Sequence, residues 1–419
     1  MSRTRTAGRV GSRRYGRHGR WVVVAVVLTV LGLPFTGRVL WVAYGPVGDD
    51  PVAQLRYLDA ALGEGGGQDM QGLFPEGEFF SWALTGVAAG RVARDETRPA
   101  GDREFARGLA ARALEALDNP AVADRFGLSA TEYADGPGRL RYGVFYRGWR
   151  LSLLNEMATW DPAAATLATS EAAAILTAVD SSPSGWLESY PDQFWPCDTV
   201  VALAAAATTD PAAAEPVVAR WLARTGAATD PATGLIAHRV DDTGRSTSGA
   251  RATSSSLIVA FWPSLLDDPA PWSAYKKTFV TNRLGMTGAL EYPPGTPAGA
   301  GDVDSGPLIL GLSPVASAVT QAAARANGDT GLADQLNREI ELLGMPWQPG
   351  NQRTYLFGQL LVAVAFFVWA DTTALGGETE QSAPAAAWWA LAAIPVVPAA
   401  AAWLMWALRP PAAKARRRL

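Results

Sequence analysis

The connections between apolar stretches alternate in length along most of this chain. Twelve stretches have the apolar spacing, caps and breakers that are typical of helices. They run over 51–63, 76–94, 102–118, 142–160, 162–179, 197–209, 211–226, 253–266, 268–283, 304–327, 330–344 and 355–370. The connection before an even-numbered stretch is mostly long, whereas the connection after it is mostly a short turn. The alternation predicts an all-α (α/α)6 toroid, a ring of six helix pairs with the long loops at one end.

Short turns between the pairs share a signature. Asp161-Pro162, Asp210-Pro211 and Asp268-Pro269 each place an Asp before a Pro at the start of a predicted helix. The Asp side chain can cap the free N–H groups of the first turn, and Pro fits the first helical position because that position needs no N–H donor. These turns therefore support the predicted helix starts.

Two apolar segments, 21–44 and 385–408, flank this body, and both are long enough to cross a bilayer at roughly 20 residues. Basic tails, 1–20 and 409–419, lie beyond them and hold no acidic residue. Because positive flanks favour the cytoplasmic side, both tails are predicted to be cytoplasmic, with transmembrane helices at both ends of the domain. The first segment is interpreted as an uncleaved anchor. The body, 45–370, is then expected outside the cytoplasm at the cell membrane.

A third apolar segment, 355–370, is shorter than the other two. Two cytoplasmic tails require an even number of spans, and the connector that follows it, 371–384, is acidic. Asp49 and Asp50 make the other external flank acidic as well. We therefore interpret 355–370 as the last helix of the toroid. The alternative is a third span, with one basic tail outside the cytoplasm.

The charge distribution argues against several function classes. The two tails hold twelve of the 36 Lys and Arg residues and none of the 40 Asp and Glu residues, so the body is acidic. An acidic body is a poor nucleic-acid binder. With Cys197 as the only cysteine and His238 as the only histidine outside the tails, no Cys-rich or His-rich metal site is possible. No metal and no cofactor are expected.

Acidic, aromatic and other functional side chains lie at or near the starts of the predicted even-numbered helices. A toroid would gather these starts around one funnel. The candidate catalytic residues are Asp302, Asp304, Cys197, Asp198 and His238. The candidate substrate-binding residues are Glu76, Tyr142, Tyr146, Arg147, Trp195, Glu291 and Tyr292. Acids, a thiol and an imidazole are the groups that acid/base chemistry uses. The aromatic residues can line a pocket or, alternatively, plug the core.

Each catalytic candidate also has a structural interpretation. One of Asp302 and Asp304 can cap the helix predicted from 304, while the other faces the funnel as an acid or base. Cys197 lies at a helix start, where a thiol can be acidified, but a small buried cysteine is common in cores. Asp198 is a catalyst or a cap. His238 is a proton shuttle or a structural loop residue.

Two stretches carry a family resemblance. Residues 190–198, which contain W-P-C-D, and residues 301–307, which contain D-x-D-S-G-P, resemble the linalool dehydratase-isomerase superfamily and its membrane-attached bacterial relatives. The resemblance covers about residues 60–370. It implies an (α/α)6 barrel and acid/base dehydration, hydration or isomerisation of a small alcohol. The family's enzyme uses a pair of cysteines, whereas this chain has only Cys197.

Three functions remain open. The first is a membrane-anchored lyase or isomerase for a small alcohol, which a narrow apolar pocket around Cys197 would favour. The second is a glycan-active enzyme, which two carboxylates on facing loops, about 5–10 Å apart, would favour. The third is a non-catalytic surface receptor or scaffold, which a funnel filled by side chains would favour.

Overall fold

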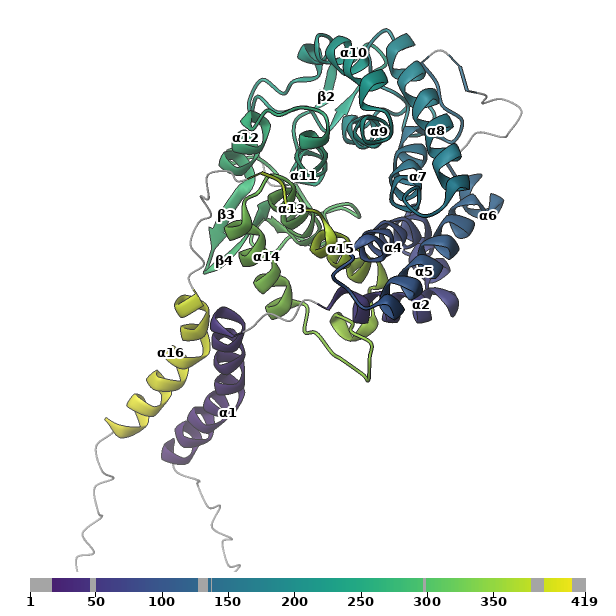
Figure 1. Ribbon diagram of the computed structural model, residues 1–419. Helices are drawn as coiled ribbons and strands as arrows, with labels where there is room; N and C mark the ends of the chain where they lie inside the picture. The colour runs from purple at the N-terminus through teal and green to yellow at the C-terminus, as the bar shows by residue number, and fades with distance from the viewer. Residues whose placement is uncertain are drawn as a thin grey trace, which may run out of the picture. The chain divides into compact units, whose positions relative to one another are not determined.

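The computed structural model describes residues 17–45, 50–126, 135–136, 138–296, 299–377 and 388–408, with side chains from Trp21 onward. The basic tail 409–419, most of the other tail, and residues 378–387 of the acidic connector and the second apolar segment lie outside the described residues. The chain is mostly helical, as predicted. Figure 1 shows the arrangement of its helices and strands.

The helices begin and end close to the predicted bounds in most cases. Their ranges are α1 Arg17–Tyr44, α2 Pro51–Gly63, α3 Gly66–Gln71, α4 Gly77–Arg94, α5 Ala100–Asp118, α6 Pro120–Ala123, α7 Gly143–Met157, α8 Pro162–Ser181, α9 Pro196–Thr209, α10 Pro211–Leu222, α11 Ala252–Phe261, α12 Ala270–Phe279, α13 Pro314–Ala326, α14 Thr330–Leu343, α15 Leu361–Thr372 and α16 Trp388–Ala407. Three 3-10 turns are η1 Thr225–Ala228, η2 Trp262–Ser264 and η3 Leu356–Gly358.

The sequence predicted no strands, and it assigned 280–283 and 312–313 to helices. Among the described residues, five short strands lie between the helices. They are β1 Arg239–Val240, β2 Ser246–Ser248, β3 Val280–Arg283, β4 Met286–Leu290 and β5 Leu312–Ser313. β1 pairs with β2, and β3, β4 and β5 form a three-stranded sheet in that order. Within the sheet, β4 and β5 are antiparallel. Strand pairing in these connections provides hydrogen bonds for backbone N–H and C=O groups that have no partner within a helix.

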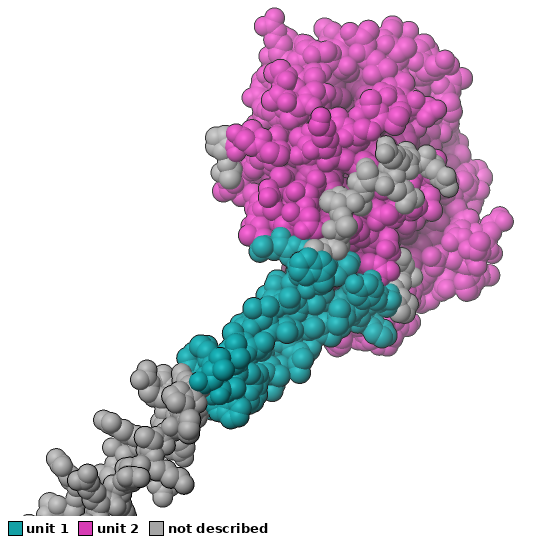
Figure 2. Space-filling model, turned by 90° about the vertical axis from the view of Figure 1, so that its left-hand side faces the viewer, with its two compact units in different colours: residues 1–46, 284–286, 387–419 teal, residues 47–283, 287–386 magenta. Residues whose placement is uncertain are grey.

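Two compact units make up the chain (Figure 2). One contains α1 and α16 together with residues 284–286. Within it, α1 and α16 run antiparallel, because Thr36 donates to the Ala392 carbonyl at 3.0 Å and Trp403 donates to the Thr29 hydroxyl at 3.1 Å. The other unit contains the remaining helices and the candidate site.

Six helices of the larger unit pack in a closed succession: α4 on α7, α7 on α9, α9 on α11, α11 on α13, α13 on α15, and α15 on α4 (Figure 1). Each also packs against a further helix, respectively α5, α8, α10, α12, α14 and α2. Small residues permit the close contacts. Gly148 on α7, for example, faces Ala202 on α9 so closely that an added Cβ would lie 3.0 Å from the Ala202 backbone.

Asp and Ser caps define the helix starts as the sequence signature indicated. Asp161 accepts from the N–H groups of Ala163 and Ala164, and Asp210 accepts from that of Ala213. The third turn differs, because α12 begins at Ala270, whose N–H is bound by Asp268, and Pro269 precedes the helix.

Two predicted helices begin later than expected. The stretch 304–327 is helical only from Pro314, and its N-cap is Ser313, not Asp304. The chain before it includes Gly306, Leu310 and Gly311 with positive φ, a conformation that cannot continue a helix. The stretch 355–370 is helical from Leu361, because Leu356, Phe357 and Gly358 also have positive φ. The tenth and twelfth predicted helices are therefore shorter than their apolar patterns indicated.

Three helices among the described residues are long and apolar enough to cross a membrane: Trp21–Tyr44, Pro162–Ser181 and Trp388–Ala407. The sequence patterns pointed to the first and third of these. The second, α8, packs against α7, α9 and α10. Helix α15 is shorter, and it packs against α4, α2 and α13 of the larger unit.

Candidate active site

A cavity of about 540 Å³ lies where the six helices of the closed succession begin. Each of them contributes a residue from its first turn or its N-terminal cap. These include Glu76 for α4, Phe145 for α7, Cys197 for α9, Thr253 for α11, Val315 for α13 and Leu360 for α15. The loop before α13 adds Asp302 and Asp304. The cavity therefore brings together functional side chains that are far apart in sequence.

Phenylalanine and aliphatic side chains form most of the cavity wall. Phe80 packs against Phe145 with ring centroids 5.1 Å apart and against Phe366 at 5.5 Å. Leu257 and Val319 complete this apolar wall. Such a wall offers few hydrogen-bonding groups, so it selects an apolar ligand body.

The polar side of the cavity centres on Asp198 and Cys197 in the first turn of α9. Pro196 occupies the first helical position, and both following side chains are buried. The Cys197 thiol lies 3.6 Å from the Asp198 carboxylate. Burial raises the pKa of Asp198 to about 7, with smaller contributions from the negative charges of Glu76 and Asp304, although hydrogen bonds from Ser189 and Cys197 oppose the rise. Asp198 is thus poised to exchange a proton near neutral pH.

The thiol of Cys197 behaves differently from the reactive thiol that its helix position suggested. Burial and the neighbouring negative charge of Asp198 raise its pKa well above the usual value. These effects oppose the favourable field of the helix N-terminus. They favour the buried-cysteine interpretation of Cys197 over the acidified thiol, and the thiol can donate to Asp198.

Asp304 is a second carboxyl with a raised pKa. Desolvation, followed by repulsion from Asp302 and Glu76, raises its pKa to about 6. The residue as a whole is exposed to solvent, which weakens both effects relative to those at buried Asp198. It does not cap α13, since Ser313 does so. Its side chain is free to serve the cavity that it lines.

Arg251 separates the role of Asp302 from that of Asp304. Its guanidinium lies 2.7 Å from Asp302 and 2.7 Å from Glu291. Burial alone would raise the pKa of Asp302, but the ion pair and the Ser305 N–H hold that pKa below its usual value. Glu291 is fully buried, and burial raises its pKa despite the pairing. Glu291 therefore holds Arg251 in place and does not reach the cavity wall. Tyr292 lies beneath the same guanidinium, with its ring centroid 5.2 Å away.

Tyr190 and Glu76 form the third polar group at the cavity. The Tyr190 hydroxyl donates to the Glu76 carboxylate at 2.5 Å. Burial and the charge of Glu76 raise the pKa of Tyr190, so the phenol remains protonated. Trp195 stands edge-on to Tyr190 at 5.4 Å and is covered by the guanidinium of Arg239 at 4.9 Å.

His238 lines the cavity from the loop that precedes β1. Its Nδ1 lies 2.5 Å from the Ser254 hydroxyl. Burial, together with the positive charge of Arg251, lowers the pKa of His238 to about 4. The imidazole is therefore neutral at physiological pH, and it acts as a hydrogen-bonding group there.

Of the predicted residues, the structure brings Glu76, Trp195, Cys197, Asp198, His238, Asp302 and Asp304 to one cavity. It places Tyr142, Tyr146 and Arg147 elsewhere, in a second cavity of about 520 Å³. Consecutive helical residues point about 100° apart. Because Phe145 packs beside Phe80 in the wall of the first cavity, the residues that follow it on α7 face away from that cavity.

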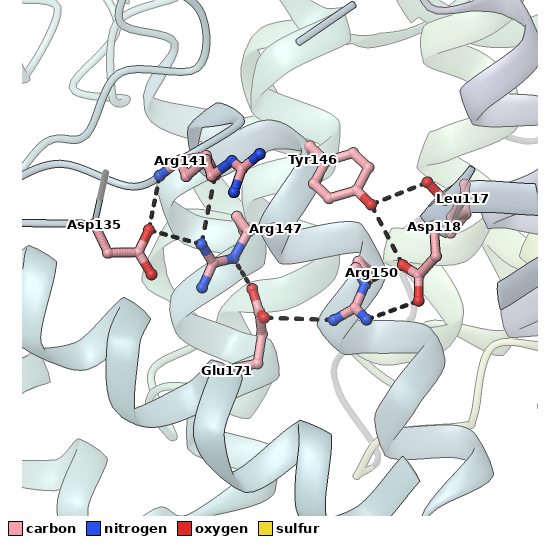
Figure 3. A network of polar contacts seen from close by, with 8 residues as sticks. All are labelled: Leu117, Asp118, Asp135, Arg141, Tyr146, Arg147, Arg150 and Glu171. Carbon is pink, nitrogen blue, oxygen red and sulfur yellow. Dashed lines mark hydrogen bonds and ion pairs between the residues drawn. The ribbon is translucent and has the colours of Figure 1, made fainter. Parts of the chain in front are cut away.

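Figure 3 shows the network to which Tyr146 and Arg147 belong. Tyr146 donates to the Leu117 carbonyl at 3.0 Å, which joins α7 to α5. Arg147 pairs with Glu171 of α8 and, at 2.9 Å, with Asp135. The charges of three arginines and three acidic residues balance in this network. The network joins α7 to its outer neighbours and does not line the first cavity.

Sequence reasoning missed Tyr190 and Ser254 as candidates. Tyr190 precedes Cys197 in the same stretch, and its proximity to Glu76 could not be inferred from spacing. Ser254 is one of three consecutive serines at the start of α11. Its contact with His238 depends on the loop path between η1 and β1. The apolar wall carries no sequence signal that separates it from the core.

Among the described residues, no group of three or more His, Cys, Asp or Glu side chains is placed to hold a metal ion. Comparison of the chain with protein-family models and with curated proteins gave no match.

Proposed function

We propose that this chain is a membrane-anchored (α/α)6 toroid that acts as an acid/base lyase or isomerase on a small, largely apolar alcohol. The closed succession of six helices, each packed on a further helix, supports the toroid. The length and apolar character of α1 and α16 support the anchoring. The resemblance of residues 190–198 and 301–307 to the linalool dehydratase-isomerase superfamily supports the reaction class.

One observation carries the reaction: two carboxyls with raised pKa values, Asp198 and Asp304, share a cavity whose wall is otherwise apolar. Neighbouring carboxyls whose environments separate their pKa values are suited to opposite roles, one as acid and one as base. The volume of about 540 Å³ lies in the range of small-molecule sites. The ligand's hydroxyl would lie at the carboxyls and its hydrocarbon body against the phenylalanines.

In the dehydration direction, protonated Asp198 gives its proton to the hydroxyl oxygen, and the C–O bond breaks as water leaves. The Asp304 carboxylate takes a proton from the adjacent carbon, and the electron pair of that C–H bond forms the C=C bond. The reverse sequence hydrates the alkene, and re-addition of water at another carbon isomerises the alcohol. Asp198 is the acid because its pKa, about 7, is the higher of the two.

Other groups position the pair. The positive charge of Arg251 neutralises the negative charge of Asp302, so that Asp302 can stay ionised beside the Asp304 carboxylate. Cys197 donates its S–H to Asp198. Protonated Tyr190 and neutral His238 are available to hold the leaving water.

The glycan-active alternative is less well supported by the same cavity. A sugar presents many hydroxyls, and these require donors and acceptors around the ligand. Phe80, Phe145 and Phe366 offer none. The scaffold alternative expects a filled funnel, whereas the cavity is open.

The test is a turnover assay on the purified full-length chain with a panel of acyclic and cyclic tertiary and allylic alcohols. We expect loss of water from at least one alcohol, and incorporation of ¹⁸O from labelled water in the reverse direction. Asp198→Asn and Asp304→Asn should each lower kcat by a factor of 100 or more, on the order of general acid/base contributions.

Asp210→Asn is the matched control, because Asn caps a helix as well as Asp does and position 210 lies far from the cavity in the turn before α10. The control should retain full activity. The proposal is wrong if the two cavity variants retain the activity of the control.

A further inference from the structure

The connection between α14 and α15, residues 344–358, exposes large apolar side chains to solvent. The side chains of Met345, Trp347 and Phe357 are 46%, 58% and 65% exposed. Leu360, two residues beyond this connection, lines the candidate active site. An exposed apolar surface is costly in water, and it usually marks a contact with a partner or a membrane.

This exposure is held in place and does not reflect a loose loop. Trp347 and Thr354 exchange two backbone hydrogen bonds of 2.9 Å each. Tyr355 is buried, and its hydroxyl donates to Glu341 at 2.6 Å. Met345 and Phe357 have φ values of 46° and 56°, a conformation that surrounding contacts must enforce in residues with a side chain. These contacts thus hold the apolar side chains in a fixed position that faces solvent.

The same connection is joined to the start of α2. The Arg353 N–H donates to the Ala53 carbonyl at 2.9 Å, and the Tyr57 hydroxyl donates to the Gly358 carbonyl at 3.1 Å. Only residues 45–50 separate the end of α1 from the start of α2. An extended chain covers at most about 3.6 Å per residue, so this linker reaches at most about 25 Å.

We propose that residues 344–358 insert Met345, Trp347 and Phe357 into the interfacial layer of the bilayer that holds α1, as a third membrane contact. The chain between α1 and α2 is short, and α2 is the helix that this connection contacts. The connection carries no acidic residue, although the body as a whole is acidic, and its single cation, Arg353, pairs with Glu341 at 2.6 Å. Tryptophan is the side chain most favoured at the boundary between headgroups and hydrocarbon.

This inference rests on anchoring by α1 but not on the proposed chemistry.

The test places single cysteines in the full-length chain, labels them with an environment-sensitive nitrobenzoxadiazole dye, and reconstitutes the protein in vesicles with and without nitroxide-labelled lipids. Trp347→Cys and Phe357→Cys are the test positions. Leu167→Cys on α8, an exposed apolar site at 44%, is the matched control. The native Cys197 is buried, and the unmodified chain measures its background. Leu31→Cys, 70% exposed on α1, reports the anchor itself.

We expect emission at shorter wavelength and quenching by headgroup-proximal nitroxides at positions 347 and 357, and neither effect at position 167. Dye that is shielded at 347 but not quenched by any lipid probe would indicate a second copy of the chain as the occupant and overturn the proposal. So would dye at 347 that is as exposed as at 167. Absence of quenching at position 31 would instead refute the anchoring on which both proposals rest.

Discussion

At the scale of single residues, the site depends on how burial redistributes protons among its acids. The pKa values of Asp198 and Asp304 are raised because the protein removes water from them and places negative charge nearby. Asp302 stays ionised because Arg251 compensates it. Two Asp residues that are two positions apart in sequence therefore have opposite pKa shifts, a difference that their sequence context alone does not indicate.

The raised pKa of Asp198 makes a prediction about stability. In the unfolded chain its pKa is near 3.8, whereas in the folded chain it is about 7. Between these values the folded chain binds a proton that the unfolded chain releases. The proton on Asp198 therefore stabilises the folded chain fully below about pH 4, and this stabilisation is lost progressively as pH rises to about 7. Above pH 7 the loss is on the order of 4 kcal/mol.

Asp198→Asn removes this titration, because an amide stays neutral. The melting temperature of the variant should match that of the native chain near pH 4 and exceed it near pH 8. Thermal unfolding followed by circular dichroism across this pH range, in detergent, measures the difference. A difference that does not change with pH would show that Asp198 has an ordinary pKa in the folded chain.

At the scale of helices, close approach depends on small residues at particular contacts. Gly86 on α4 lies where α5 and α7 meet it, and an added Cβ would lie 2.7 Å from the Cβ of Ala113 and 3.0 Å from Leu153. We expect Gly86→Ala to lower the free energy of unfolding, because overpacking costs about 1–3 kcal/mol and outweighs the better helix propensity of alanine.

Gly101→Ala is the matched control on α5. Nothing lies within 4 Å of the Cβ that it adds. It should raise the free energy of unfolding by up to about 1 kcal/mol. Chemical denaturation of both variants measures the pair. Equal effects would mean that α4 does not approach its neighbours as closely as the structure indicates.

At the scale of the whole molecule, the two terminal helices predict the membrane topology of the chain. Their antiparallel packing in the smaller unit brings Thr29 beside Trp403 and Thr36 beside Ala392, as two spans with both tails on one side require. With basic tails inside, the body is predicted to lie outside the cytoplasm.

Labelling of intact cells tests this orientation. Ala232→Cys places a thiol on an exposed loop of the larger unit. We expect an impermeant maleimide to react with it before lysis, because the body would face the medium or an accessible periplasm. The native chain, with its buried Cys197, gives the background. Reaction only after lysis would place the body in the cytoplasm.

The helical character of the chain, the approximate range of most helices and the apolar character of the two terminal segments could all be predicted from the sequence. These follow from local information: apolar periodicity, Asp-Pro caps and continuous apolar runs. It also indicated Cys197, Asp198, Asp302 and Asp304 as chemistry-bearing residues, because such residues are conspicuous at helix starts. Its errors at 304–313 and 355–360 arose where apolar residues continue through loops with positive φ. It also extended the helix 268–283 into strand β3, which begins at Val280.

Which of these residues lie together depends on how the helices pack. Phe145 reaches the cavity and Tyr146 does not, because adjacent positions on α7 face different neighbours. Tyr190 joins Glu76 across 114 positions of sequence, a contact that no local pattern encodes. The raised pKa values of Asp198 and Asp304 likewise depend on the tertiary fold, since desolvation and the distances between charges exist only once the helices have packed.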